Sequence, residues 1–143
     1  MPLTDRKYSV GLIYASGTAD RTGATLDMSG FQEVDMIVSL ATIAVGGTNS
    51  IKAQSDSDSA FGSPQDIVGT AMTIVDDDDG QLFILHLANP PERYVRIYVD
   101  KDTSNACAES VLYVQHKPDT KPITNDSATV TTESHVWAAD GTA

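Results

Sequence analysis

The chain has 143 residues, with 20 acidic against 9 basic side chains, and its formal net charge is −11. That length suits one domain, and an apolar fraction of 41% is too high for a wholly disordered chain. We expect no membrane span and no secretory signal, because no apolar run is long enough for either. The single cysteine, Cys107, cannot form an internal disulfide. These features indicate a soluble, acidic protein of a reducing compartment or of an assembly.

The acidic excess is concentrated in the middle of the chain. Between Thr22 and Glu92 the only basic residue is Lys52. Because affinity for nucleic acid comes mainly from cations that neutralise phosphates, we expect no direct binding to nucleic acid. The charge either serves solubility alone or guides the chain to a locally positive partner.

Apolar and polar residues alternate with a period of two along most of the chain, as half-buried antiparallel strands require. The clearest case is RYVRIYVD, where Val95, Ile97 and Val99 lie opposite Tyr94 and Arg96. No segment has a convincing helical stripe, and Ser104–Ser110 is interpreted as a loop that leads into the last strand. The predicted strands, in chain order, are Tyr8–Ala15, Thr25–Met28, Val34–Ala44, Ser50–Ser55, Ala71–Val75, Gln81–Leu87, Arg93–Asp100 and Ser110–Gln115.

Turn residues separate these segments, and Gly46-Gly47-Thr48-Asn49 is interpreted as the turn of a β-hairpin. About eight short strands with turn signals every 8–15 residues or so predict an all-β fold. The expected architecture is a β-sandwich of antiparallel strands, either jelly-roll or immunoglobulin-like.

The last 28 residues, His116–Ala143, have a different composition, rich in Thr and Ser and interrupted by Pro118 and Pro122. We therefore divide the chain into a sandwich domain, 1–115, and an extended C-terminal arm, 116–143. Burial of the arm's four apolar anchors would stabilise it by about 6–12 kcal/mol in total, less than the cost of ordering its backbone at about 1–2 kcal/mol per residue. The arm either pairs with a sheet or a neighbouring subunit, or stays disordered. The anchors are Ile123, Val130, Val136 and Trp137.

The sequence predicts no catalytic site, cofactor or metal site, and hence no enzyme. The histidines His86, His116 and His135 are far apart in the chain, and His86 in FILHLA is interpreted as an ordinary strand residue. Cys107 has no activating neighbour and is interpreted as a small buried apolar residue. Motifs for nucleophilic, nucleotide-binding or zinc chemistry are absent from the sequence.

Two weaker patterns leave alternatives open. Asp76–Asp79 and Asp56–Ser59 are rich in oxygen ligands, but neither fits a calcium-binding loop, so a solvated acidic turn is favoured over a Ca²⁺ site. Tyr94 and Tyr98 flank Arg96 and form either a small sugar-binding platform or a packed cross-strand pair, of which packing is favoured.

Four segments in a fixed order carry a more specific signal. They are TLDMSGF (25–31), VDMIVSL (34–40), IKAQSDSDSAF (51–61) and RYVRIYV (93–99). Together they resemble a family of small tailed-bacteriophage proteins, head decoration or cement proteins with β-sandwich folds. The resemblance covers about residues 20–115, and the long arm and the Asp76–Asp79 run depart from it.

The resemblance implies a late structural protein of the virion, made in the host cytoplasm and bound to the capsid exterior. The implied partners are the major capsid protein and further copies of the chain, most simply in a homotrimer. Candidate interface residues are Arg93, Tyr94, Arg96, Ile123, Val130, Val136 and Trp137. The alternatives are a tail or head–tail component, or a carbohydrate- or cell-surface-binding module on the virion.

Overall fold

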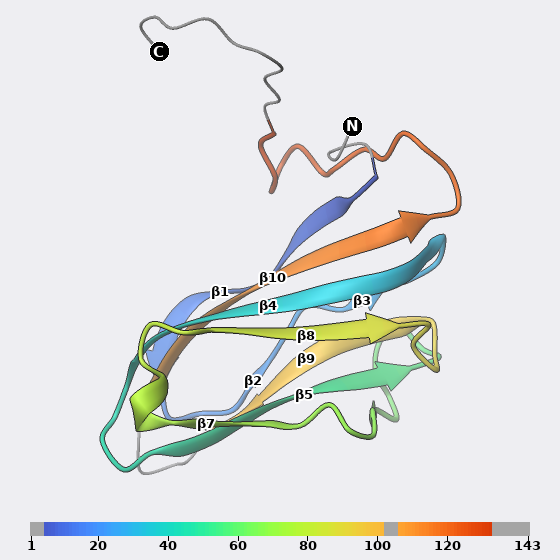
Figure 1. The fold of residues 1–143 in the computed structure, drawn as a ribbon. Coiled ribbons are helices and arrows are strands. Elements are labelled where there is room, and N and C mark those ends of the chain that lie inside the picture. The colour runs from blue at the N-terminus through green and yellow to red at the C-terminus, as the bar shows by residue number, and fades with distance from the viewer. Residues whose placement is uncertain (1–4, 102–105, 133–143) are drawn as a thin grey trace, which may run out of the picture.

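Two antiparallel sheets, packed face to face, make up the computed structural model, which describes residues 5–101 and 106–132 (Figure 1). The four-stranded sheet has the order β1 (Lys7–Gly17), β10 (Cys107–Pro118), β4 (Phe31–Ile43) and β8 (Leu82–Ala88). The six-stranded sheet has β9 (Tyr94–Asp100) and β5 (Thr48–Asp56) at its centre, the short β2 (Arg21–Thr22) and β3 (Leu26–Asp27) beside β9, and β6 (Gln65–Asp66) and β7 (Met72–Val75) beside β5. The predicted all-β sandwich is confirmed.

The order of the strands is that of a jelly roll. With β2 and β3 taken as one interrupted strand, and β6 and β7 as another, the described residues form eight strands. Successive strands alternate between the sheets except at β5 and β6/β7, which are neighbours in the six-stranded sheet. This order is that of a jelly roll and decides between the two expected sandwich types. All eight predicted strands are present, and only the two-residue strands β2 and β6 lie outside them.

The prediction of a hairpin at Gly46–Asn49 was wrong. Strands β4 and β5, on either side of this turn, lie in different sheets and do not pair with each other. The turn therefore carries the chain from one layer to the other, and Gly46 has the positive φ of 78° that glycine adopts easily.

The core lies between the sheets and follows the predicted alternation where the strands are regular. In β4 the side chains of Val34, Met36 and Val38 are fully buried, as are Val95, Ile97 and Val99 in β9. The alternation fails in β1, where register shifts interrupt its pairing with β10, so that the inward position is Gly11 while Val10 and Tyr14 are exposed. Such irregularities reorient every later side chain of a strand.

Tyr113 joins the two sheets at the centre of the core. It belongs to β10, and its buried hydroxyl accepts a hydrogen bond from the backbone N–H of Ile97 in β9 and donates one to the carbonyl of Ala24, both at 3.1 Å. Burial raises the pKa of this phenol to about 12. A Cβ atom on Gly11 would come within 2.8 Å of the ring, and one on Gly23 within 2.4 Å of the hydroxyl oxygen, so glycine makes room for the aromatic side chain at both positions.

A buried cluster of ion pairs connects the sheets at another place. Glu109 of β10 contacts Lys101 (Nζ to Oε2, 2.9 Å) and Arg21 (Nη1 to Oε1, 2.6 Å). The side chains of Lys101 and Glu109 are both fully buried. Lys101 also donates to the carbonyl of Cys107, which is buried as predicted, and burial raises the pKa of the Cys107 thiol to about 11.

The last strand, β10, is longer than the predicted Ser110–Gln115. Strand β10 continues to Pro118, which pairs with Phe31. Proline has no N–H to donate, but at the end of a strand this interrupts no hydrogen bonds between interior residues. The Ser104–Ser110 prediction was also wrong in part, since β10 starts at Cys107; residues 102–105 lie outside the described part of the chain. Among the described residues, no helix is long and apolar enough to cross a membrane.

Candidate functional site on the outer face of the four-stranded sheet

An apolar row crosses the outer face of the four-stranded sheet. The strand register aligns Val10 of β1 with Leu112 of β10, Leu112 with Ile37 of β4, and Ile37 with Ile84 of β8. Val10, Leu112 and Ile84 are 42%, 38% and 56% exposed. Leu82, also exposed, extends the row along β8. We call Val10, Leu112, Ile37, Ile84 and Leu82 the apolar row.

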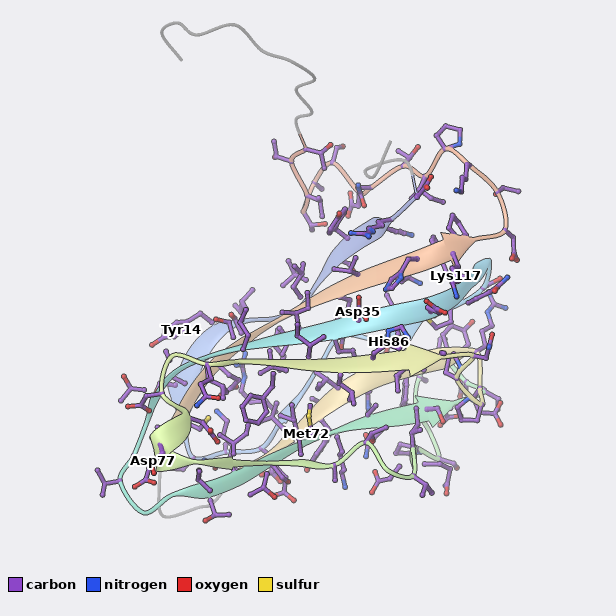
Figure 2. All side chains as sticks on the ribbon, viewed as in Figure 1. Tyr14, Asp35, Met72, Asp77, His86 and Lys117 are labelled. Atoms are coloured by element: carbon purple, nitrogen blue, oxygen red, sulfur yellow. The ribbon has the colours of Figure 1, made fainter. Side chains whose placement is uncertain are left out.

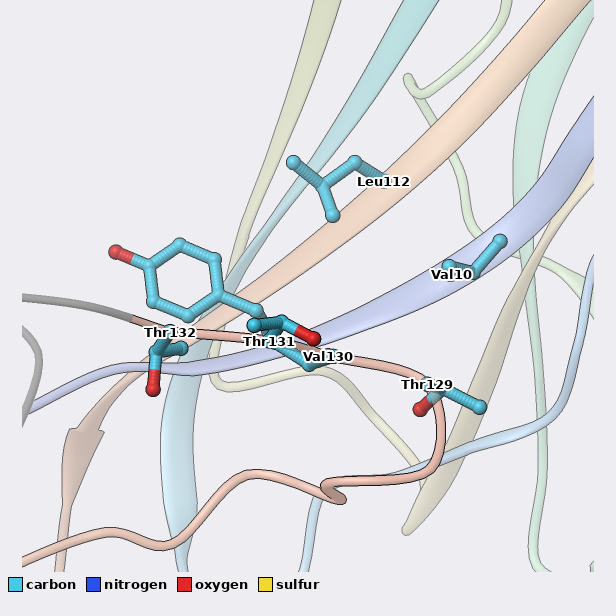
Figure 3. Close-up of a pocket in the computed structure, with 7 residues that line it drawn as sticks. Val10, Leu112, Thr129, Val130, Thr131 and Thr132 are labelled. Atoms are coloured by element: carbon cyan, nitrogen blue, oxygen red, sulfur yellow. The ribbon is translucent and has the colours of Figure 1, made fainter. Parts of the chain in front are cut away.

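The arm lies against one end of this row. Val130 and the neighbouring threonines line a groove of about 510 Å³ together with Tyr8, Val10 and Leu112 (Figure 3). Asn125 holds the arm there by accepting a hydrogen bond from the Tyr8 backbone N–H at 2.7 Å, and Lys121 pairs with Asp5 at 2.9 Å. The groove is open and mainly apolar, which suits an apolar side chain of another polypeptide.

A cluster of histidines and carboxylates adjoins the row on the same face. Glu33 and Asp35 of β4 lie between His86 of β8 and His116 of β10, because the register pairs Asp35 with His86 and Glu33 with His116. Figure 2 shows Asp35 and His86 close together on the neighbouring strands β4 and β8, with Lys117 near the end of the sheet. We call Glu33, Asp35, His86 and His116 the histidine–carboxylate cluster.

Asp35 contacts both rings of this cluster. Its Oδ1 lies 2.6 Å from His86 Nδ1, and its Oδ2 lies 2.9 Å from His116 Nε2. Glu33 is held by Lys117, whose ammonium donates to Oε1, and this hydrogen bond keeps the pKa of Glu33 below its usual value. His86 was interpreted correctly as a strand residue, but sequence reasoning missed that it shares a site with His116. His135 lies outside the described residues.

Among the predicted interface residues, the two arginines are engaged within the chain. Arg93 donates to both carboxylate oxygens of Asp27, at 2.9 and 2.8 Å. Arg96 donates to Gln54 at 3.0 Å and lies over the ring of Phe61, 4.2 Å from its centroid. The strands β3 and β5, adjacent to β9, supply the hydrogen-bond partners Asp27 and Gln54.

These contacts connect three of the four sequence motifs. Asp27 belongs to the first motif, Gln54 and Phe61 to the third, and Arg93 and Arg96 to the fourth. The first, third and fourth motifs thus contact one another in the six-stranded sheet, whereas the second forms part of β4 in the other sheet.

The two tyrosines of the possible sugar platform also have partners within the chain. Arg93 lies 5.1 Å from the centroid of the Tyr94 ring, and Lys52 lies 5.2 Å from that of Tyr98. The Tyr98 hydroxyl donates to Asp20 at 2.8 Å. Packing of these residues against their neighbours, the favoured interpretation, accounts for both rings.

Two of the four predicted arm anchors lie within the described residues. Ile123 and Val130 are half-buried, while Val136 and Trp137 lie outside the described residues. The first part of the arm thus contacts its own sandwich, although through few side chains. Of the expected alternatives, pairing with a sheet or a neighbouring subunit or disorder, the described part of the arm comes nearest to the first, since it contacts β1 through the side chain of Asn125.

Both acidic loops are built by hydrogen bonds to backbone N–H groups. Asp76 accepts from Gly46, and Asp79 accepts from Ile43, around the 3₁₀ turn η2 (Asp76–Asp78). Asp56 accepts from Asp58 and Ser63 and thereby closes its loop, and these bonds lower the pKa of Asp56. These carboxylates therefore stabilise the conformations of the two loops, in accordance with the interpretation of both segments as acidic turns.

Comparison with known proteins adds information on the fold. No protein-family model and no curated protein matches the chain. The structure is similar to the crystal structure of the PBSX exported protein XepA, with a TM-score of 0.55 and 13% sequence identity. The similarity covers 91% of this chain and 43% of XepA, so the chain spans less than half the length of that protein. At this identity the comparison shows a shared β-sandwich fold.

Proposed function

We propose that this chain is a structural virion protein of a tailed phage, a decoration or cement protein on the outside of the head. It would bridge subunits of the major capsid protein, most simply as a homotrimer, and thereby stabilise the shell. The proposal draws on the four motifs that resemble such proteins and on the sandwich fold.

The apolar row is the observation that carries the proposal. Exposed apolar patches of this kind on a soluble protein mark surfaces that bind other proteins. The row lies on a rigid sheet and continues into the groove beside Val130, so one face presents both a flat surface and a recess. A capsid subunit docked there would bury the row and leave the acidic loops in solvent.

Cementing requires only modest affinity for each contact. When one oligomer binds several capsid subunits, every contact after the first forms at a high effective concentration. In this proposal Val136 and Trp137 act as anchors on a neighbouring capsid subunit or copy. Their part of the arm continues from the segment that already lies along β1.

The test uses phage heads that lack this protein. We expect the purified full chain to bind expanded heads and to raise the temperature at which they release DNA. Ile84→Glu should abolish binding, because it places a charge in the middle of the buried patch, while the variant remains folded. Val68→Asp is the matched control, since Val68 is apolar and 98% exposed but lies away from the four-stranded sheet, between β6 and β7.

Two outcomes would contradict the proposal. Heads with and without the protein that release DNA at the same temperature would exclude cementing. Binding to tails or to isolated glycans instead of heads would favour one of the other virion roles.

A further inference from the structure

We infer that Glu33, His86 and His116 form a binding site for one divalent transition-metal ion, such as Zn²⁺, with Asp35 orienting the two imidazole rings. This inference concerns the histidine–carboxylate cluster and does not rest on the proposed function.

The argument begins with the direction of the ring nitrogens. Asp35 contacts Nδ1 of His86 and Nε2 of His116, and a carboxylate accepts hydrogen bonds. The ring nitrogen that each histidine turns toward Asp35 therefore carries the proton. In the neutral imidazole the other nitrogen of each ring has a lone pair, and this is the form that binds a metal ion.

Both of these remaining nitrogens face the same oxygen atom. His116 Nδ1 lies 3.6 Å from Glu33 Oε2, and His86 Nε2 lies 3.9 Å from it. One ligand atom from each of the three residues lies within 4.8 Å of the others. Three electron-pair donors thus converge, an arrangement that a cation between them stabilises.

The spacing fits a transition metal after a small adjustment. Zn–N and Zn–O bonds of about 2.0–2.2 Å at a tetrahedral angle place neighbouring ligand atoms roughly 3.3 Å apart. The two histidine–Glu33 separations, 3.6 and 3.9 Å, exceed this by a few tenths of an ångström, and the two imidazole ligand atoms lie within 4.8 Å of each other. His86 is able to close the difference because its side chain is 47% exposed, and a small shift of the ring can keep its contact with Asp35.

The surroundings also suit a metal site. Metal-binding histidines usually donate their second ring N–H to a carboxylate, and here Asp35 serves both rings at once. Lys117 binds Oε1 of Glu33 and leaves Oε2 available. Its charge opposes that of a cation, but the two carboxylates of the cluster outweigh one ammonium.

The ligand types determine which ions bind. Two imidazoles and one carboxylate suit Zn²⁺, Ni²⁺ or Cu²⁺, whereas Ca²⁺ and Mg²⁺ require oxygen ligands. Three protein ligands leave a fourth tetrahedral position, which the exposure of His86 opens to water or to a side chain of a docked protein. A bound ion would also connect β4, β8 and β10, and thus three neighbouring strands of one sheet.

The experiment is a calorimetric titration of the chelator-treated full chain with Zn²⁺, together with thermal unfolding with and without the ion. We expect one ion per chain and a higher unfolding temperature in its presence, because an ion that binds only the folded state stabilises it. His86→Gln and His116→Gln should each abolish binding. Asp35→Asn should weaken it by about 10–100-fold, as is typical of a residue that orients metal ligands.

His135→Gln serves as the matched control, because it also removes one of the chain's three histidines. It should retain Zn²⁺ binding, and Ca²⁺ should give no binding in any variant. Unfolding temperatures measured in chelator should be similar for all variants, which shows that loss of binding is not loss of fold. The inference is wrong if the wild type does not bind Zn²⁺, or if binding depends on His135 but not on His86 and His116.

Discussion

The outer faces of the two sheets differ in how far their side chains are satisfied within the chain. On the six-stranded sheet, Lys52 pairs with Asp66 at 2.7 Å, Gln54 donates to the same carboxylate, and Arg96 donates to Gln54. On the four-stranded sheet, the apolar row is open to solvent and the histidine–carboxylate cluster directs ring nitrogens at a carboxylate oxygen. The polar side chains on the six-stranded sheet thus have partners within the chain. The four-stranded sheet instead has exposed apolar side chains and ring nitrogens that a partner protein or an ion would contact.

The largest expected effect concerns the buried ion pairs that connect the two sheets. Glu109→Gln leaves the buried ammonium of Lys101 without its counter-charge, and we expect a loss of about 3–5 kcal/mol in the free energy of unfolding. Chemical denaturation measures this loss. The double variant Glu109→Gln/Lys101→Met should recover part of it, and a loss below about 1 kcal/mol for the single variant would mean that the ion pair is not buried in solution.

The next effect concerns the contact between the layers. Tyr113→Phe removes the hydroxyl that Ile97 and Ala24 share, and we expect a loss of about 1–3 kcal/mol. The exposed Tyr14→Phe is the control and should leave stability unchanged. Equal stability of both variants would contradict the bridging role of Tyr113.

The same tyrosine predicts how stability depends on alkaline pH. Its pKa is raised to about 12 in the folded chain, against about 10 when unfolded. The unfolded state therefore loses the proton first, and the stabilisation is complete below pH of about 10 and is lost as the pH rises toward 12. Urea unfolding at a series of alkaline pH values should show this decline in the wild type and a weaker one in Tyr113→Phe.

A smaller effect should distinguish the two outer faces directly. Arg96→Ala removes a cation–π contact with Phe61 and a hydrogen bond, so we expect it to lower stability by about 1 kcal/mol without affecting head binding. Ile84→Ser should alter stability by no more than about 0.5 kcal/mol and should weaken head binding. The opposite result, in which Arg96→Ala loses binding, would move the interface to the six-stranded sheet.

The smallest effect is that of the surface pair on the six-stranded sheet. Asp66→Asn should cost about 0.2–1 kcal/mol, because the Lys52–Asp66 pair is exposed and screened. The hydrogen bond from Lys52 lowers the pKa of Asp66, so this contribution is present above pH of about 4 and is lost as the pH falls below it. Denaturation at pH 7 and in acid, with added salt as the control for screening, measures both effects.

Much of the fold could be predicted because strand pattern is a local property. The alternation of Val95, Ile97 and Val99 predicts which side of β9 is buried without knowledge of its neighbours. The pairing of β4 with β10 instead of β5 could not be predicted in this way, since turn residues such as Gly46 serve a hairpin and a crossing between layers equally well.

The candidate site could hardly be predicted from the sequence, because it too depends on which strands become neighbours. Glu33, His86 and His116 come from three strands that only the jelly-roll order makes neighbours. The motif arginines were visible, but their partners Asp27 and Gln54 lie on strands far away in the sequence. The one available signal in the sequence was that each of two predicted strands has a polar residue at an outward position. Many surface residues have this property, so it does not identify a site.

The central claim is that the outer face of the four-stranded sheet attaches the protein to the phage head. A reconstruction of heads with and without the bound chain tests it most directly, at a resolution that distinguishes the two sheets. The account predicts difference density on the head exterior, with Leu112 and Ile84 against the capsid subunits. Attachment through Tyr94 and Arg96 on the opposite face, or difference density only on the tail, would contradict it.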